Sequence, residues 1–153
     1  MGAAFTGNFA HTIDPKGRAT IPACYRMALG DRFTIGLNSQ MNALALYPLE
    51  KWNQIEADLN RIASTDAKGM RYVRFINGFS FTDCQLDSQG RVLLPSILRQ
   101  KVGIMDKAIR FVGVGQCLEI WAEDRFVQET EQTELSSEEL LAYINEKYFQ
   151  PRD

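Results

Sequence analysis

Hydrophobic and polar positions change their spacing several times along the chain, and each change marks a new predicted element. Residues 33–37 and 43–47 alternate at a period of two, which is the spacing of a strand with one buried face. Pro48 is followed by apolar residues at helical spacing, which indicates an amphipathic helix through about residue 63. Before these elements, the pattern predicts a strand over 5–13, a strand over 19–21 and a short helix over 23–29.

The second half of the chain predicts the same order of elements. It contains expected strands at 81–86 and 91–94, a helix at 96–102, and strands at 108–113 and 117–121. Between the halves, a polar stretch (64–69) is typical of a linker, and residues 70–79 favour a helix. Near the end, Ser136 and Ser137 with Glu139 resemble a capping box, which predicts a last helix over 137–148.

Two blocks of the sequence are similar to each other without a gap. Residues 13–30 read IDPKGRATIPACYRMALG, and residues 86–103 read LDSQGRVLLPSILRQKVG. Matched glycines and prolines indicate matched backbone geometry, because these residues are chosen for the φ angles they allow. The similarity continues, with one residue of slippage, from 44–52 to 118–126. The chain is therefore predicted to be an internal duplication of a β-turn-β-α-β-β unit.

Length and composition are typical of a soluble globular protein with one compact domain or two very small ones. The chain is 45% hydrophobic and 24% charged, and units of about 45 residues are too small to be stable alone. Three widely spaced cysteines fit neither a disulfide framework nor a zinc site. We expect Cys24 and Cys117 to fill small spaces in the core, in the reducing cytoplasm. No apolar run approaches 18 residues, so no membrane contact is predicted.

Charge is distributed unevenly along the chain, although its net value is only −2. Residues 1–118 carry 14 Lys or Arg and 9 Asp or Glu, whereas residues 119–153 carry 3 and 10. Such asymmetry is typical of a basic working face beside an acidic segment. A solvated acidic helix at the C-terminus explains the second segment equally well.

The duplicated blocks share the motif D-x-x-x-R around a turn. An aspartate at the first position of a turn accepts hydrogen bonds from backbone N–H groups that follow it. We therefore expect a structural role in the hairpins for Asp14, Gly17, Asp87 and Gly90. Two interpretations of Arg18 and Arg91 stay open: each pairs with its aspartate, or each is presented to a phosphate or a guanine edge.

Nothing in the sequence predicts an enzyme. His11 is the only histidine, and no nucleophile elbow is present. Asp14 and Asp87 could form a catalytic pair in principle, but equivalent positions of a duplicated unit rarely converge on one cleft. No catalytic residue, metal site or cofactor is therefore predicted.

The segments HTIDPKGRATIPACYR and QLDSQGRVLLPSILR resemble the two signature segments of the MraZ family of bacterial transcriptional regulators. This family belongs to the AbrB/SpoVT-like, swapped-hairpin group. The resemblance implies an α+β fold in which two tandem repeats form one pseudo-symmetric, β-barrel-like core with flanking helices. The expected parts are repeat 1 (5–52), connecting helices (53–80), repeat 2 (81–126) and an acidic C-terminal helix (127–153).

The same resemblance implies a cytoplasmic, nucleoid-associated repressor without a small-molecule substrate. Such proteins form homo-oligomeric rings on direct repeats of double-stranded promoter DNA, upstream of the division and cell-wall gene cluster that includes their own gene. The expected DNA-facing residues are Lys16, Arg18, Gln89 and Arg91. Arg26 and Arg99 either contact phosphate or pair locally. The alternatives are a ring-forming scaffold that does not read DNA and an antitoxin-like partner of a toxin.

Overall fold

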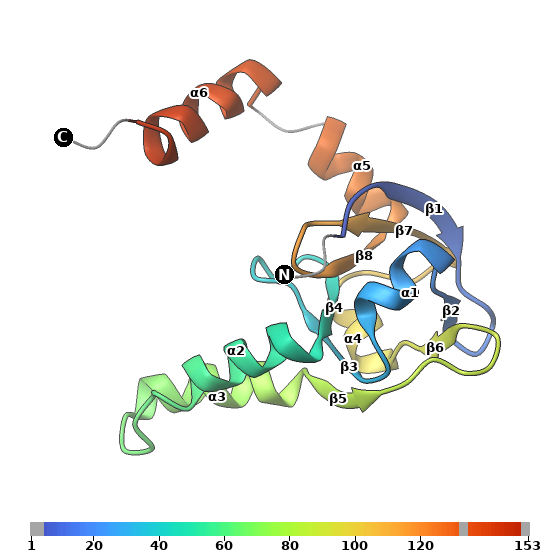
Figure 1. The fold of residues 1–153 in the computed structure, drawn as a ribbon, viewed down its shortest axis with the longest axis horizontal. Coiled ribbons are helices and arrows are strands. Elements are labelled where there is room, and N and C mark those ends of the chain that lie inside the picture. The colour runs from blue at the N-terminus through green and yellow to red at the C-terminus, as the bar shows by residue number, and fades with distance from the viewer. Residues whose placement is uncertain (1–4, 132–134, 151–153) are drawn as a thin grey trace. The chain divides into compact units, whose positions relative to one another are not determined.

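The structure of the protein is a computed structural model, which describes residues 5–131 and 135–150. It divides into two compact units, residues 1–123 and 124–153. Figure 1 shows the described elements. The first repeat and the helices after it contain β1 (Asn8–Thr12), β2 (Arg18–Thr20), α1 (Ala23–Leu29), β3 (Phe33–Leu37), β4 (Leu44–Pro48), α2 (Leu49–Leu59) and α3 (Ala67–Gly78).

The second repeat follows with the same order of elements. It contains β5 (Phe81–Cys84), β6 (Arg91–Leu93), α4 (Ser96–Lys101), β7 (Ala108–Gly113) and β8 (Leu118–Ala122). The second compact unit contains the helices α5 (Glu123–Glu131) and α6 (Ser137–Tyr148). Only the first residue of α5, Glu123, belongs to the first unit. Ser136 accepts a hydrogen bond from the N–H of Glu139, which confirms the predicted cap of α6.

The strands of the two repeats are interleaved. A six-stranded antiparallel sheet has the order β1-β7-β8-β4-β3-β5, and β2 pairs with β6 in a separate two-stranded ribbon. The first strand of each repeat therefore pairs with the other repeat: β1 lies against β7, and β5 lies against β3. The predicted fold class, α+β with two repeats in one pseudo-symmetric core, is confirmed.

Strand register locates the pseudo-twofold axis. In the central pair of the sheet, Ala45 lies opposite Glu119, its own equivalent in the second repeat. In the ribbon, Ala19 lies opposite Val92, again its own equivalent. A residue that pairs with its own copy must lie on the symmetry axis. One axis therefore passes through the centre of the sheet and the centre of the ribbon.

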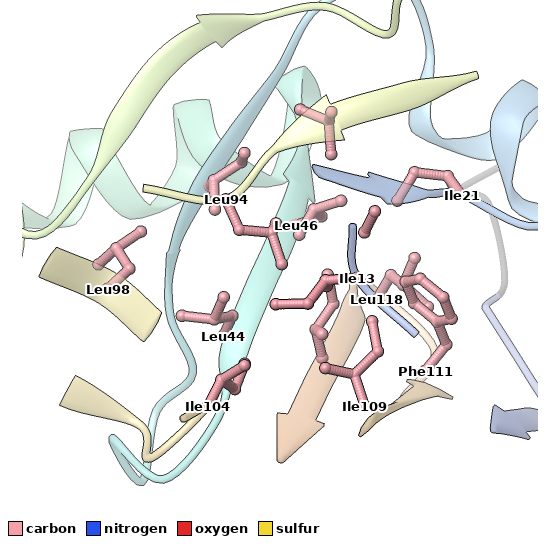
Figure 2. Packing of buried hydrophobic residues seen from close by; sticks show 14 of the residues in the cluster. Ile13, Ile21, Leu44, Leu46, Leu94, Leu98, Ile104, Ile109, Phe111 and Leu118 are labelled. Carbon is pink, nitrogen blue, oxygen red and sulfur yellow. The ribbon is translucent and has the colours of Figure 1, made fainter. Parts of the chain in front are cut away.

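Both repeats contribute to one shared hydrophobic core (Figure 2), beside a smaller cluster that includes Tyr47, Trp52 and Cys117. Leu44 and Leu46 extend from β4, while Ile109 and Phe111 come from β7, and all four are fully or almost fully buried. Alternate residues of each strand face this core because successive side chains point to opposite faces. The ribbon covers one side of the core through Ala19, Val92 and neighbouring residues.

Some sequence predictions differ from the structure in detail. The helix expected from residue 70 begins at Ala67, because the Asp66 side chain caps it by accepting a hydrogen bond from the N–H of Gly69. Helix α5 was not predicted as a separate element. Of the predicted acidic helix 127–153, residues 132–134 and 151–153 lie outside the described residues. Cys24, expected in the core, is exposed, whereas Cys117 is buried as predicted.

Candidate nucleic-acid interface

The first signature segment folds into a turn that Asp14 organises. The N–H of Gly17 donates to the carbonyl of Asp14, closing the turn. Oδ1 of Asp14 accepts hydrogen bonds from the N–H groups of Lys16 and Arg18, at 3.0 and 2.8 Å. Gly17 adopts a φ of +86°, which is costly for residues with a Cβ atom. The structural role that the sequence predicted for Asp14 and Gly17 is thus visible in the geometry.

The second oxygen of the aspartate holds the arginine. Nε of Arg18 donates to Oδ2 of Asp14 over 2.6 Å. Hydrogen bonds from the backbone N–H of Arg18 and from its side chain keep the pKa of Asp14 below its ordinary value, although partial burial acts in the opposite direction. The carboxylate is therefore ionised near neutral pH, and the arginine is fixed beside the turn.

The second signature segment repeats these contacts atom for atom. Oδ1 of Asp87 accepts from the N–H groups of Gln89 and Arg91, and Oδ2 accepts from Nε of Arg91 over 2.8 Å. Hydrogen bonds, first of all from the backbone N–H of Arg91, also lower the pKa of Asp87. Gly90 has a φ of +78°. The two turns are structural equivalents despite their different tips.

Each turn is held in place by hydrogen bonds from the other repeat. The N–H of Leu94 donates to the carbonyl of Gly17, and the N–H of Ile21 donates to that of Gly90. Nε of Arg99 donates to the carbonyl of Leu94, and its guanidinium covers Gly17, where a Cβ atom would lie 2.7 Å from Nη2.

Arg26 makes the equivalent contacts with Gly90 and with the carbonyl of Ile21. Arg26 and Arg99 were expected either to contact phosphate or to pair locally. In the structure both make local hydrogen bonds, to the carbonyl groups of Ile21 and Leu94.

The ribbon of β2 and β6 has one buried and one outward face. Ala19 and Val92 on the axis are buried in the core. Residues on either side of them face outward because side chains alternate along a strand. The outward positions are Arg18, Thr20, Arg91 and Leu93, and the side chains of Arg18 and Arg91 are 32% and 28% exposed.

Symmetry places the two arginines on one face of the ribbon. Arg18 pairs with Leu93, and Arg91 lies two residues from Leu93, so the arginines are offset by about 7 Å along the ribbon. The turn tips Lys16 and Gln89 are exposed beside them. The structure thus brings the four predicted DNA-facing residues to one region, the outward ribbon face and its two turns.

Two further residues of this face, Thr20 and Leu93, were not predicted from the sequence. Leu93 is 55% exposed despite being apolar, and Thr20 is half-buried. The detectable signal was the period of two: Thr20 lies two positions after Arg18, Leu93 lies two positions after Arg91, and the residue between is apolar in both strands.

Other candidate chemistry has little support within the part of the chain that the structure describes. His11 lies on β1 with its ring edge-on to Phe111, at 5.6 Å between ring centres. The described residues contain no group of three or more His, Cys, Asp or Glu side chains placed to hold a metal ion. None of the described helices has the length and apolar character needed to cross a membrane.

Comparison with known proteins agrees with the duplicated signature. The sequence model of the family described as "MraZ protein, putative antitoxin-like" matches residues 4–75 and 80–143, one match in each half of the chain. The chain belongs to the MraZ family.

Curated relatives in this family cover almost the whole chain. A protein of Thermoanaerobacter pseudethanolicus is 38% identical over 92% of this chain and 96% of its own length. One from Desulforamulus reducens is 40% identical with the same coverage, and one from Desulfitobacterium hafniense is 40% identical over 85% of this chain and 89% of its own. Each of these MraZ proteins is named "Transcriptional regulator MraZ", a name that describes a non-enzymatic role.

Proposed function

We propose that this protein is a transcriptional repressor that binds promoter DNA through the outward face of its two-stranded ribbon. The observation that carries the proposal is the placement of Arg18 and Arg91 on this face, between the exposed tips Lys16 and Gln89. The major groove of B-DNA admits a two-stranded β-ribbon. The names of the curated MraZ relatives support a regulatory role.

The chemistry of the ribbon face suits both backbone and base contacts. Arginine and lysine neutralise phosphates or contact guanine edges, and glutamine can pair with adenine. An exposed leucine such as Leu93 can contact the methyl group of thymine. Because the aspartates hold Nε of each arginine, the guanidinium groups are oriented before DNA arrives. This lowers the entropy lost on binding.

The two turns are proposed to read DNA unequally. Pro15-Lys16 gives the first turn a cation at its tip, whereas Ser88-Gln89 gives the second turn a neutral amide. Backbone geometry is the same in both, so the difference lies in the side chains alone. We assign more of the phosphate attraction to the first turn and more of the base discrimination to Gln89.

Assembly into a ring-shaped homo-oligomer would multiply this weak contact. One subunit offers few positive side chains, but linked subunits on successive direct repeats raise the effective concentration of each next contact. Exposed methionines of the first unit, Met27 (94%) and Met105 (77%), offer apolar surface for subunit contacts. The proposed operators lie upstream of the division and cell-wall cluster, including the protein's own gene.

Gel-shift and footprinting experiments test this proposal. The purified protein should retard DNA from upstream of its own gene when that DNA carries tandem direct repeats, and should protect the repeats in a footprint. A single repeat should bind much more weakly, since linkage between subunits is lost. Retardation of neither the tandem-repeat nor the shuffled DNA would instead favour the ring-forming scaffold that does not read DNA, and equal retardation of both would contradict sequence-specific binding.

A further inference from the structure

The outward face of the ribbon has an approximate twofold symmetry that its side chains do not fully keep. The axis passes between Ala19 and Val92, which lie opposite each other. A protein surface with twofold symmetry binds DNA sites of matching symmetry, because the two strands of the duplex run in opposite directions. A ribbon with two identical halves would therefore bind equally well in both directions along a site. A preferred direction requires residues that differ between the halves.

The two arginines of the face give no direction. Nε of Arg18 donates to Asp14 over 2.6 Å. Nε of Arg91 donates to Asp87 over 2.8 Å. The two arginine side chains are similarly exposed, at 32% and 28%. Each half of the face thus offers one guanidinium group, held in the same way, to a phosphate or a guanine edge.

The residues opposite the arginines differ. Arg18 lies opposite Leu93 on one side of the axis, and Arg91 lies opposite Thr20 on the other side. In each case the two residues form a non-hydrogen-bonded pair, because the hydrogen bonds of the ribbon join the residues next to them. The Cα atoms of such pairs are about 4.5 Å apart and their side chains are close together. One half of the face is therefore an arginine with a leucine, and the other half is an arginine with a threonine.

Leucine and threonine suit different bases. The side chain of Leu93 is 55% exposed and has no hydrogen-bonding group. In the major groove, an apolar side chain contacts the C5-methyl group of thymine favourably. Over another base, leucine would cover polar groups without satisfying them, which is unfavourable. Thr20 is half-buried, and its hydroxyl group can donate or accept a hydrogen bond, so it suits more than one base.

We propose that Leu93 and Thr20 set the direction in which each subunit lies on its operator repeat, with Leu93 over the methyl group of a thymine. The inference rests on the proposed binding of promoter DNA by the ribbon face, and it adds the residues that orient the protein there. The subunits of a ring are related by rotation, so all of them read in the same sense. That arrangement matches direct repeats rather than inverted ones.

Replacement of thymine by uracil tests the methyl contact, because uracil lacks only the C5-methyl group. Each thymine of one repeat in a tandem-repeat promoter DNA is replaced in turn, and binding is measured by fluorescence anisotropy. For the unaltered protein, one of these replacements should weaken binding by about fourfold, the effect of one methyl-sized group. In Leu93→Ser, the same replacement should leave the affinity unchanged.

Ile97→Ser is the matched control for Leu93→Ser. Ile97 lies on α4, is 48% exposed and is not part of the ribbon. The control makes a similar change from an apolar to a polar side chain away from the proposed interface. It should keep the uracil sensitivity of the unaltered protein.

Inversion of alternate repeats in place tests the direction. The unaltered protein should bind this DNA about tenfold more weakly than direct repeats, since every second subunit then meets mismatched bases. Leu93→Thr gives both halves of the face an arginine and a threonine, so the ratio of the two affinities should fall several-fold. Lys16→Gln makes the two turn tips alike instead, and it should leave most of this ratio in place.

Three results would overturn the proposal. The first is that no thymine of the repeat is sensitive to replacement by uracil. The second is that the sensitivity persists in Leu93→Ser. The third is that Lys16→Gln reduces the preference for direct repeats and Leu93→Thr does not. If the unaltered protein binds neither DNA, the proposed function itself fails, whereas binding without uracil sensitivity removes only the role of Leu93.

Discussion

At the scale of single residues, each signature aspartate makes two kinds of contact with separate oxygen atoms. Oδ1 of Asp14 accepts backbone N–H groups, and Oδ2 accepts the arginine. The spacing D-x-x-x-R was enough to predict the backbone contacts, because aspartate at the start of a turn commonly makes them. The spacing did not decide whether the arginine pairs with its aspartate or is presented to DNA. That depends on which guanidinium nitrogen faces the carboxylate, and in the structure it is Nε.

The lowered pKa values of Asp14 and Asp87 predict an acid dependence of stability. Both groups ionise more readily when folded, so they stabilise the protein above the ordinary aspartate pKa of about 4. This stabilisation is lost as pH falls through the lowered values. The Asp14→Asn/Asp87→Asn double variant should be less stable at pH 7 and should lose less stability on acidification. Urea unfolding between about pH 6 and pH 2 measures this.

The control for this measurement is Asp106→Asn, which removes one exposed carboxylate outside the turns. Its acid profile should match that of the unaltered protein. If the double variant loses stability on acidification as steeply as the unaltered protein, then the turn aspartates are not the groups responsible.

At the scale of elements, the two turns depend on residues that no local sequence pattern reveals. The turn signature predicted that Gly17 and Gly90 need a left-handed backbone. It did not predict that each glycine also leaves space for an arginine of the other repeat, Arg99 over Gly17 and Arg26 over Gly90. That contact depends on the interleaved pairing, which brings together residues more than 60 positions apart.

Two alanine substitutions separate backbone strain from this contact. Gly17 and Gly30 both have a φ above +80°, but a Cβ atom at Gly30 meets nothing within 4 Å, whereas one at Gly17 meets Arg99. Both substitutions introduce backbone strain of about 1–3 kcal/mol, because residues with a Cβ atom rarely adopt a φ in this range. Gly17→Ala should destabilise the protein further, because it also displaces the Arg99 guanidinium from the turn. Urea unfolding of both variants measures the difference.

Equal destabilisation by Gly17→Ala and Gly30→Ala would show that Arg99 moves aside without loss, and that the turns are not held across the repeats. Arg99→Ala supplies an independent check. In that background the extra effect of Gly17→Ala should disappear, because contacting residues are not additive in their effects on stability.

Most helices and strands could be predicted from the sequence, and the failures have local causes. Strands β3 and β4 were predicted from their period of two, and the bounds of α1 follow from Pro22 and Gly30. Helix α3 begins three residues earlier than expected because the Asp66 cap lies inside the apparent linker. Helix α5 has few apolar residues, so its helical period is hard to recognise.

At the scale of the whole molecule, the first compact unit is one folded structure made from two repeats. The duplication was visible in the sequence, but the strand pairs were not, because β1–β7, β3–β5 and β2–β6 all join distant segments. The resemblance to swapped-hairpin proteins implied such interleaving, and the structure confirms it.

This interleaving predicts that a destabilising substitution in one repeat also destabilises the strands of the other repeat. Leu46 of β4 is fully buried in the shared core. Leu46→Ala should destabilise the unit by about 2–5 kcal/mol. Amide hydrogen exchange should then accelerate by the same factor in β7 and β8 as in β3 and β4, since all four strands open together. Retained protection in β7 and β8 would contradict a single cooperative unit.

The outward face of the ribbon is the central functional claim, and its test requires a residue that does not also hold the fold. Arg18→Ala would break the pair with Asp14, so its effects would be ambiguous. Lys16 is exposed at the turn tip, where its side chain projects from the fold. Lys68 is a matched control: it is equally exposed, but it lies near the start of α3, at the end of the helical hairpin far from the ribbon (Figure 1).

The most direct measurement is the salt dependence of DNA binding for the unaltered protein, Lys16→Ala and Lys68→Ala. Fluorescence anisotropy with promoter DNA at several salt concentrations gives the slope of log K against log salt. If Lys16 neutralises one phosphate in each bound subunit, its removal should reduce the slope by about 0.9 per subunit. Lys68→Ala should leave the slope unchanged. An unchanged slope for Lys16→Ala, or an equal reduction for both variants, would contradict DNA binding by the ribbon face.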